Sequence, residues 1–134
     1  MQQKYSICFI DDDMVYKFFM KGVLNKMKLA DNVITFVDGE EAFDFIDKNK
    51  EKPENLPDLI FLDINMPIMD GFQFMDEYMK IHATFKKQIT IYMVTSSIDP
   101  IDLERSRQYP EISDFIIKPM NVSTLEQIIH RLRE

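Results

Sequence analysis

Five short apolar runs divide the chain, and a polar residue follows each of them. The runs cover residues 5–10, 33–37, 59–62, 89–94 and 115–117. They are rich in β-branched and aromatic residues, as is typical of buried strands. Residues 59–62 are continuously apolar, as expected for a strand that is covered on both faces of a sheet. The pattern therefore predicts five strands.

Between these runs, apolar residues recur every three or four positions, which is the spacing of one helix face. Asp13 and Asn121 are suitable amino-terminal caps, and Pro100 favours the start of a short fourth helix. Residues 47–57 are polar, contain two prolines and are expected to form an exposed loop. The residues predicted to face inward are Val15, Phe18, Phe19, Val23 and Met27 in the first helix, Ala42, Phe45 and Ile46 in the second, Phe72, Met75, Tyr78, Met79 and His82 in the third, and Val122, Leu125, Ile128, Ile129 and Leu132 in the last.

Strand and helix signals alternate along the whole chain. Their connection lengths suit right-handed crossovers, so the sequence predicts an α/β fold in which helices cover both faces of a doubly wound parallel sheet. A length of 134 residues fits one domain, spanning 1–134. The segment after Lys118 is long enough for one helix, and we expect no effector domain after it.

Composition and charge narrow the classes of function. An apolar fraction of 46% is typical of a globular protein and argues against disorder. The 16 Lys+Arg and 23 Asp+Glu give a net charge of −7, which disfavours direct contact with nucleic acid or an anionic membrane. No apolar stretch approaches the length of a membrane span, and the single cysteine, Cys8, lies in an apolar run. We therefore expect a cytoplasmic protein with a buried thiol.

The residues at the strand ends carry the candidate chemistry. Asp11, Asp12 and Asp13 follow the first strand, and Asp63, Thr95 and Lys118 follow the third, fourth and fifth. In a sheet of this kind the carboxyl ends of the strands flank the ligand site. Two carboxylates about 4 Å apart repel by roughly 4 kcal/mol at an effective dielectric constant near 20, so the cluster needs cations. Lys118 and Mg²⁺ would supply them, because oxygen ligands suit Mg²⁺ better than zinc.

Such a cluster can form an acyl phosphate. A carboxylate attacks phosphorus while a metal ion, a lysine and a hydroxyl neutralise the developing charge. Asp63 is the candidate nucleophile.

These residues resemble the receiver domain of two-component response regulators over nearly the whole chain. The resemblance rests on Asp11-Asp12, Asp63-Ile64-Asn65-Met66-Pro67-Ile68-Met69-Asp70-Gly71, Thr95-Ser96 and Phe115-Ile116-Ile117-Lys118-Pro119. It implies a flavodoxin-like, five-stranded parallel sheet of order 2-1-3-4-5 with five helices. It also implies a signalling protein, not an enzyme that acts on a separate substrate.

The resemblance assigns a role to each site residue. Asp63 would accept a phosphoryl group from a histidine kinase or a phosphotransfer protein in a phosphorelay. Asp12 and Asp63 would bind Mg²⁺ through their carboxylates, Asn65 through its backbone carbonyl and Asp11 through a water molecule. Lys118 would pair with the phosphoryl group, and Thr95 would donate its hydroxyl to a phosphoryl oxygen.

The resemblance also implies a conformational switch on phosphorylation and a surface that passes the signal on. Thr95 and Phe115 would change position on phosphorylation, and Asn65 and Ser97 would tune dephosphorylation. The surface of the fourth helix, fifth strand and fifth helix would contact an unidentified downstream protein. Residues 109–114 differ from the small Gly-Ala type that usually precedes the last strand of the family.

Three other functions are compatible with parts of the pattern. A binding module of the same fold would lack one of the acidic, threonine or lysine residues, which are all present here. A phosphohydrolase of the haloacid dehalogenase type needs a second acid two residues after the nucleophile, where this chain has Asn65. A flavin carrier needs a phosphate-binding loop after the first strand, where Asp11–Asp13 would repel phosphate.

Overall fold

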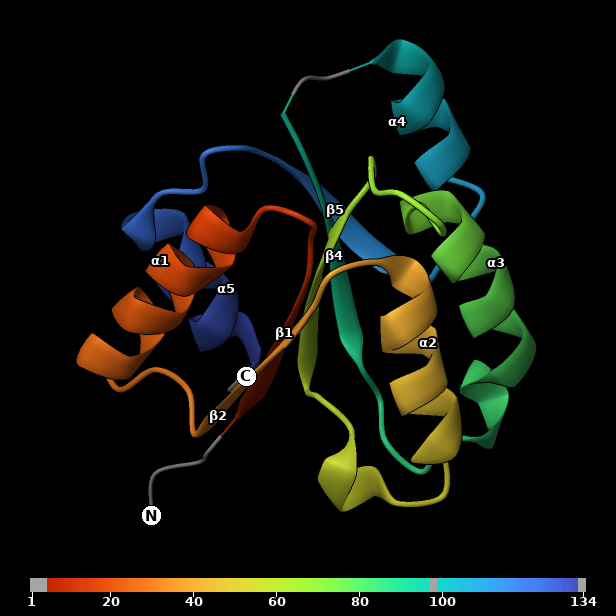
Figure 1. Ribbon diagram of the computed structural model, residues 1–134, viewed down its shortest axis with the longest axis horizontal. Helices are drawn as coiled ribbons and strands as arrows, with labels where there is room; N and C mark the ends of the chain where they lie inside the picture. The colour runs from red at the N-terminus through yellow and green to blue at the C-terminus, as the bar shows by residue number, and fades with distance from the viewer. Residues whose placement is uncertain (1–4, 97–98, 133–134) are drawn as a thin grey trace.

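The computed structural model describes residues 5–96 and 99–132 and has a parallel sheet between two layers of helices (Figure 1). The strands are β1 (Ser6–Ile10), β2 (Asn32–Phe36), β3 (Leu59–Asp63), β4 (Thr90–Thr95) and β5 (Ile112–Ile117), in the order β2-β1-β3-β4-β5. The helices are α1 (Met14–Lys26), α2 (Gly39–Lys48), α3 (Gly71–Ile81), α4 (Pro100–Ser106) and α5 (Val122–Leu132). The predicted flavodoxin-like topology is confirmed. None of the helices in these two ranges is long and apolar enough to span a lipid bilayer.

Alternating side chains of the central strands build two cores. Ile7 and Phe9 of β1 belong to the cluster under α1 and α5. Cys8 and Ile10 belong to the cluster under α2 and α3. All four are fully buried, as the period of two in a strand requires when both faces are covered. Burial raises the pKa of the Cys8 thiol, in agreement with the prediction of an unreactive core cysteine.

Side-chain caps fix where three helices begin. The Asp13 carboxylate accepts the Tyr16 N–H at 3.0 Å, and the Asn121 side chain accepts the Thr124 N–H at 2.7 Å, which confirms both predicted caps. Asp70 and Gln73 form a reciprocal capping box at the start of α3. Each cap contributes about 1 kcal/mol and sets the direction in which its helix leaves the sheet.

Some element boundaries differ from the prediction. Strand β5 begins at Ile112 and not at residue 115, because exposed Ser113 and Asp114 interrupt the apolar pattern at the edge of the sheet. The predicted loop at 47–57 is shorter, since α2 continues to Lys48 and a 3₁₀ helix covers Pro53–Asn55. This segment also buries Leu56 completely, so it is not an exposed loop throughout.

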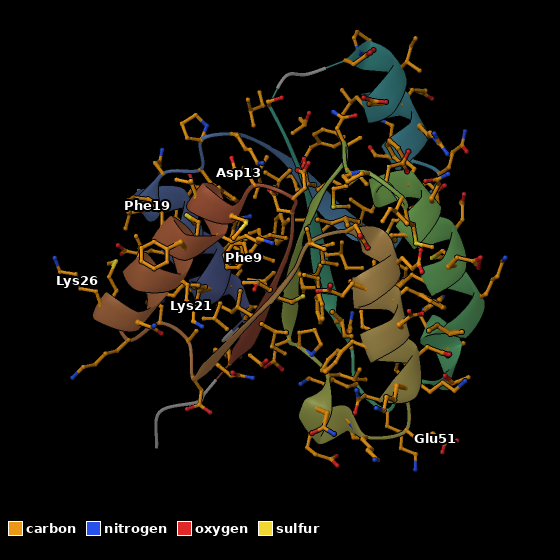
Figure 2. The ribbon with its side chains drawn as sticks, in the orientation of Figure 1. Phe9, Asp13, Phe19, Lys21, Lys26 and Glu51 are labelled. Atoms are coloured by element: carbon orange, nitrogen blue, oxygen red, sulfur yellow. The ribbon has the colours of Figure 1, made fainter. Side chains whose placement is uncertain are left out.

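The predicted inward face of α1 is wrong except at Val23, which is partly buried against the core. Val15, Phe18 and Phe19 are 79%, 82% and 60% exposed, and Figure 2 shows Phe19 on the side of α1 away from the sheet. The buried residues are Lys17, Met20 and Leu24, which also recur at helical spacing. The stem of Lys17 packs inside while its amine donates to the Phe36 carbonyl at 3.2 Å. The exposed stripe, Met14, Val15, Phe18 and Phe19, is called the α1 apolar face below.

Candidate functional site

The carboxyl ends of β1 and β3 bring three acidic residues together. Asp11, Asp12 and Asp63 each place a carboxylate oxygen within 4.8 Å of the others. Asp11 and Asp63 are buried, whereas Asp12 is exposed. Because β1 and β3 are adjacent and parallel, their ends meet at the same edge of the sheet. The predicted acidic cluster therefore exists as one site that opens to solvent at Asp12.

Lys118 is the lysine that lies within this cluster. Its Nζ is 2.6 Å from Asp11 Oδ2 and 4.0 Å from Asp63 Oδ2. Its backbone N–H donates to the Thr95 carbonyl at 2.7 Å, so the ends of β4 and β5 are joined at the site. Thr95 itself is buried. The four predicted strand-end positions are thus brought to one place.

Negative charge exceeds positive charge in the cluster, and this excess contributes to a raised pKa of Asp63. Burial, followed by repulsion from Asp11, raises the pKa of Asp63 to about 6. Lys118 and a hydrogen bond from the Ile64 backbone act in the opposite direction but do not cancel the rise. Asp63 is therefore ionised at neutral pH, yet its ionised form is less stable than that of an ordinary carboxylate.

Backbone contacts hold the acidic loop in place. The Phe36 carbonyl at the end of β2 accepts the Asp11 N–H at 3.1 Å and also accepts the Lys17 amine. The Asp13 N–H donates to Asp11 Oδ1 at 2.9 Å. One oxygen of Asp11 thus binds backbone, while the other faces Lys118. Asp11 is oriented by its own loop and by β2.

The loop after Asp63 needs a glycine where it returns to the sheet. A Cβ atom at Gly71 would lie 2.5 Å from the Asp63 carbonyl oxygen, which no side chain can do without moving the backbone. The Gly71 N–H donates to the Ile64 carbonyl at 2.9 Å. Ile68, at the tip of this loop, is exposed and has a φ of 67°, which is uncommon for a β-branched residue. Gly71 therefore fixes how closely α3 approaches the acidic residue.

The remaining predicted residues lie around this centre. Asn65 is exposed two residues after Asp63, and Phe115 is half-buried against the core under α2 and α3. Ser97 lies outside the residues that the structure describes. Tyr16 was not predicted as a site residue, but its ring centroid is 4.6 Å from Lys118 Nζ. Its position in the first helical turn after Asp11–Asp13 is the sequence feature that could have placed it near the site.

The donor set of the cluster fits a hard divalent cation. Carboxylate oxygens of Asp11, Asp12 and Asp63 converge, and oxygen is the ligand atom that Mg²⁺ and Ca²⁺ prefer. Neither thiol nor imidazole takes part in the cluster, so its chemistry does not suit a zinc centre. A divalent cation would also offset the repulsion from Asp11 that, together with burial, raises the pKa of Asp63.

Comparisons with known proteins agree on one family. A sequence model described as the response regulator receiver domain matches residues 7–130. Over 137 residues the chain is 27% identical to two-component response regulator 24 of Arabidopsis thaliana, covering 98% of this chain and 86% of that protein. A two-component response regulator structure from Cytophaga hutchinsonii superposes with a TM-score of 0.85 at 20% identity, with 98% of each chain covered.

A second solved structure is similar in fold and holds a metal ion. It is the receiver domain of a sensor histidine kinase from Pseudomonas aeruginosa, with a magnesium ion in its active site cleft. Its TM-score is 0.78 at 20% identity, covering 98% of this chain and 100% of that one. Some curated relatives are longer: the chain spans 54% of a probable C4-dicarboxylate response regulator from Bacillus subtilis and 7% of a hybrid signal transduction histidine kinase from Dictyostelium discoideum.

Proposed function

Because the chain belongs to the response regulator receiver domain family, we propose that Asp63 accepts a phosphoryl group from a histidine kinase or a phosphotransfer protein. The observation that carries this proposal is the position of Asp63. Its carboxylate lies at the end of the central strand β3, beside two further carboxylates and 4.0 Å from Lys118.

The proposed step is a direct transfer of the phosphoryl group. An ionised oxygen of Asp63 forms a bond to phosphorus while the phosphorus–nitrogen bond of the donor phosphohistidine breaks. The electron pair stays on the imidazole nitrogen, which takes up a proton. A pKa of about 6 leaves Asp63 ionised at neutral pH, so the nucleophile needs no separate base.

Three residues would hold a magnesium ion directly during this step, and a fourth would hold it through water. Asp12 and Asp63 would bind it through their carboxylates, Asn65 through its backbone carbonyl and Asp11 through a water molecule. When bound, the metal neutralises charge on the phosphoryl oxygens. The convergence of the three carboxylates supports this assignment, as does the excess of negative charge around Asp63.

Lys118 and Thr95 would bind the new phosphoryl group and start the switch. Charge-assisted hydrogen bonds of this kind contribute about 1.5–3 kcal/mol each. Together they approach the roughly 5.5 kcal/mol that inverts a 1:99 equilibrium. Movement of Thr95 would let Phe115 change rotamer and alter the surface of α4, β5 and α5, where a downstream protein would bind. Asn65 and Ser97 would tune the loss of the phosphoryl group.

The donor protein would approach over the α1 apolar face. Met14 directly follows the acidic loop, and the stripe continues along α1 with side chains that are mostly exposed. A run of exposed apolar side chains on a small protein usually marks a contact surface. A donor docked there would lie next to Asp63. Asp13 at the start of α1 is in the same loop as Asp11 and Asp12, whose carboxylates lie beside Asp63.

The experiment is the intact mass of the protein after incubation with Mg²⁺ and acetyl phosphate. We expect the gain of one phosphoryl group, and no gain for Asp63→Asn or when the metal is chelated. Asp58→Asn, at the opposite edge of the sheet, is the matched control and should be phosphorylated like the wild type. Absence of any gain, while another receiver is labelled in the same buffer, would favour a binding module that is never phosphorylated.

A further inference from the structure

Tyr16 is the aromatic side chain that touches the lysine of the site. It lies in the first turn of α1, and its ring centroid is 4.6 Å from Lys118 Nζ. The same ammonium group is 2.6 Å from Asp11 and 4.0 Å from Asp63. Lys118 is therefore enclosed by two carboxylates and one ring face, and its side chain is only 18% exposed.

The hydroxyl group of Tyr16 makes no hydrogen bond to the described residues of the site. Its oxygen is buried and has no hydrogen-bond partner among the residues that the structure describes. Burial and the negative charges of Asp11 and Asp63 raise the pKa of this hydroxyl, so it stays protonated and the ring stays neutral. What Tyr16 offers the site is its ring face, where the negative side of the aromatic quadrupole attracts a cation.

The ring is held in place from behind. The Phe9 and Tyr16 rings meet edge to face, with centroids 6.1 Å apart and an interplanar angle of 85°. The Tyr16 backbone N–H is fixed by the Asp13 cap. The loop that supplies the acidic residues thus also sets the position of the ring. The Tyr16 ring thus packs against β1, and its backbone is held at the start of α1.

We propose that Tyr16 is a positioning residue that confines the Lys118 ammonium group to the space between Asp11 and Asp63. This inference rests on the proposed function of Lys118 toward the phosphoryl group. In the resting protein Lys118 is nearer to Asp11, and it must shift toward Asp63 to meet a phosphoryl group there. The ring closes the α1 side of that path, so the ammonium group moves along the carboxylates and not out into solvent.

The test uses Tyr16→Phe and Tyr16→Met as a matched pair. Phenylalanine keeps the ring face and removes only the unpartnered hydroxyl, whereas methionine fills similar space without a π face. Leu24→Val is the stability control, because it weakens the same core under α1 at a residue two turns away. Each protein is measured by NMR for the Lys118 Cε protons and by mass spectrometry for the rate of phosphorylation by acetyl phosphate with Mg²⁺.

The expected NMR result is an upfield ring-current shift of the Lys118 Cε protons in the wild type and in Tyr16→Phe, and its loss in Tyr16→Met. The phosphorylation rate should fall about three- to tenfold in Tyr16→Met, the range that a partly buried cation–π contact supports. It should change by less than about twofold in Tyr16→Phe and in Leu24→Val.

Three results would overturn the proposal. The first is an unshifted Lys118 signal in the wild type, which needs no variant to fold. The second is equal phosphorylation of Tyr16→Met and wild type, and the third is an equal loss in Tyr16→Met and Leu24→Val. If the wild type takes no phosphoryl group at all, the proposed function fails, while the NMR signal still decides whether the ring confines Lys118.

Discussion

Charged side chains are paired differently at the two ends of the strands, which we call the amino edge and the carboxyl edge of the sheet. At the amino edge, just before β3, Asp58 accepts the Ser6 N–H at 2.7 Å and lies 3.0 Å from Lys87 Nζ. Lys87 also donates to the Leu56 carbonyl at 2.7 Å. At the carboxyl edge, Asp11, Asp12 and Asp63 converge, and Lys118 lies 2.6 Å from Asp11 and 4.0 Å from Asp63. The amino edge pairs one carboxylate with one ammonium group, whereas the carboxyl edge has three carboxylates and one ammonium group.

This difference separates a structural ion pair from a reactive site. Both oxygens of Asp58 have partners in the folded chain, so the pair needs nothing from outside. The carboxyl edge keeps an excess of negative charge, which contributes to the raised pKa of Asp63. Such a cluster is stabilised when it binds a divalent cation, or a phosphoryl group together with its metal. The unbalanced edge is therefore where function is expected.

The largest expected effect is on metal affinity. Asp12→Asn should weaken Mg²⁺ binding by about a hundredfold or more, because even the outer partners of metal ligands are worth 10–100-fold. Asp58→Asn at the amino edge should leave the affinity unchanged. Isothermal titration of each protein with MgCl₂ measures both values. Equal weakening by the two substitutions would remove the distinction between the edges.

The second prediction concerns pH in the absence of metal. The pKa of Asp63 is about 6 in the folded chain and 3.8 in its reference state, so the folded protein holds the proton more tightly. The contribution of Asp63 to stability is therefore most favourable at low pH and falls as the pH rises through this window, by up to about 3 kcal/mol at about 1.4 kcal/mol per pH unit. Asp63→Asn should remove this fall.

Urea unfolding of wild type and Asp63→Asn, at several pH values with a chelator, checks the prediction. The difference between the two free energies of unfolding should grow from pH 4 to about pH 6 and then level off. A constant difference across this range would mean that Asp63 is not destabilised by its neighbours.

The third prediction compares the two lysines. Lys87→Met should destabilise the fold by about 1–2 kcal/mol, because Asp58 and the Leu56 carbonyl lose a partner at a half-buried position. Lys118→Met should also destabilise the metal-free protein, since the repulsion at its edge increases. Added Mg²⁺ should restore the stability of Lys118→Met but not of Lys87→Met. Thermal unfolding with and without MgCl₂ measures this, and rescue of both variants would contradict it.

The smallest expected effect lies on α1, beside the carboxyl edge. Phe19→Ser should change the free energy of unfolding by less than about 0.5 kcal/mol, because Phe19 is mostly exposed. Met20→Ala, one position along, should cost about 2–4 kcal/mol because Met20 is buried. Urea unfolding of both variants decides between the two faces of α1. A larger loss of stability in Phe19→Ser than in Met20→Ala would mean that the face of α1 predicted from the sequence is the one that packs against the sheet.

The strands and their ends were predictable from the sequence because they depend on local pattern. Continuous apolar runs identify buried strands, and in a parallel sheet all carboxyl ends meet at one edge. That rule alone places Asp11, Asp63, Thr95 and Lys118 together. The helix caps at Asp13 and Asn121 were predictable for the same reason, since a cap is a contact over three residues.

The facing of α1 was not predictable because two stripes on it have helical spacing. The buried stripe contains Lys17, whose stem packs inside while its amine reaches the Phe36 carbonyl. A pattern rule that places every lysine outside chooses the other stripe. The Tyr16–Lys118 contact was hidden for a different reason: it joins residues from opposite ends of the chain, and only the topology brings them together.

A titration of the ¹⁵N-labelled protein with MgCl₂, followed by the backbone amide shifts, shows which end of the strands binds the metal. We expect saturable shifts at Asp11, Asp12 and Asp63, and none at Asp58 and Lys87. The same titration of Asp12→Asn should show much weaker binding. Shifts centred on the amino edge, or no saturable shift at the carboxyl edge, would contradict the claim that the excess of carboxylates there forms the metal site.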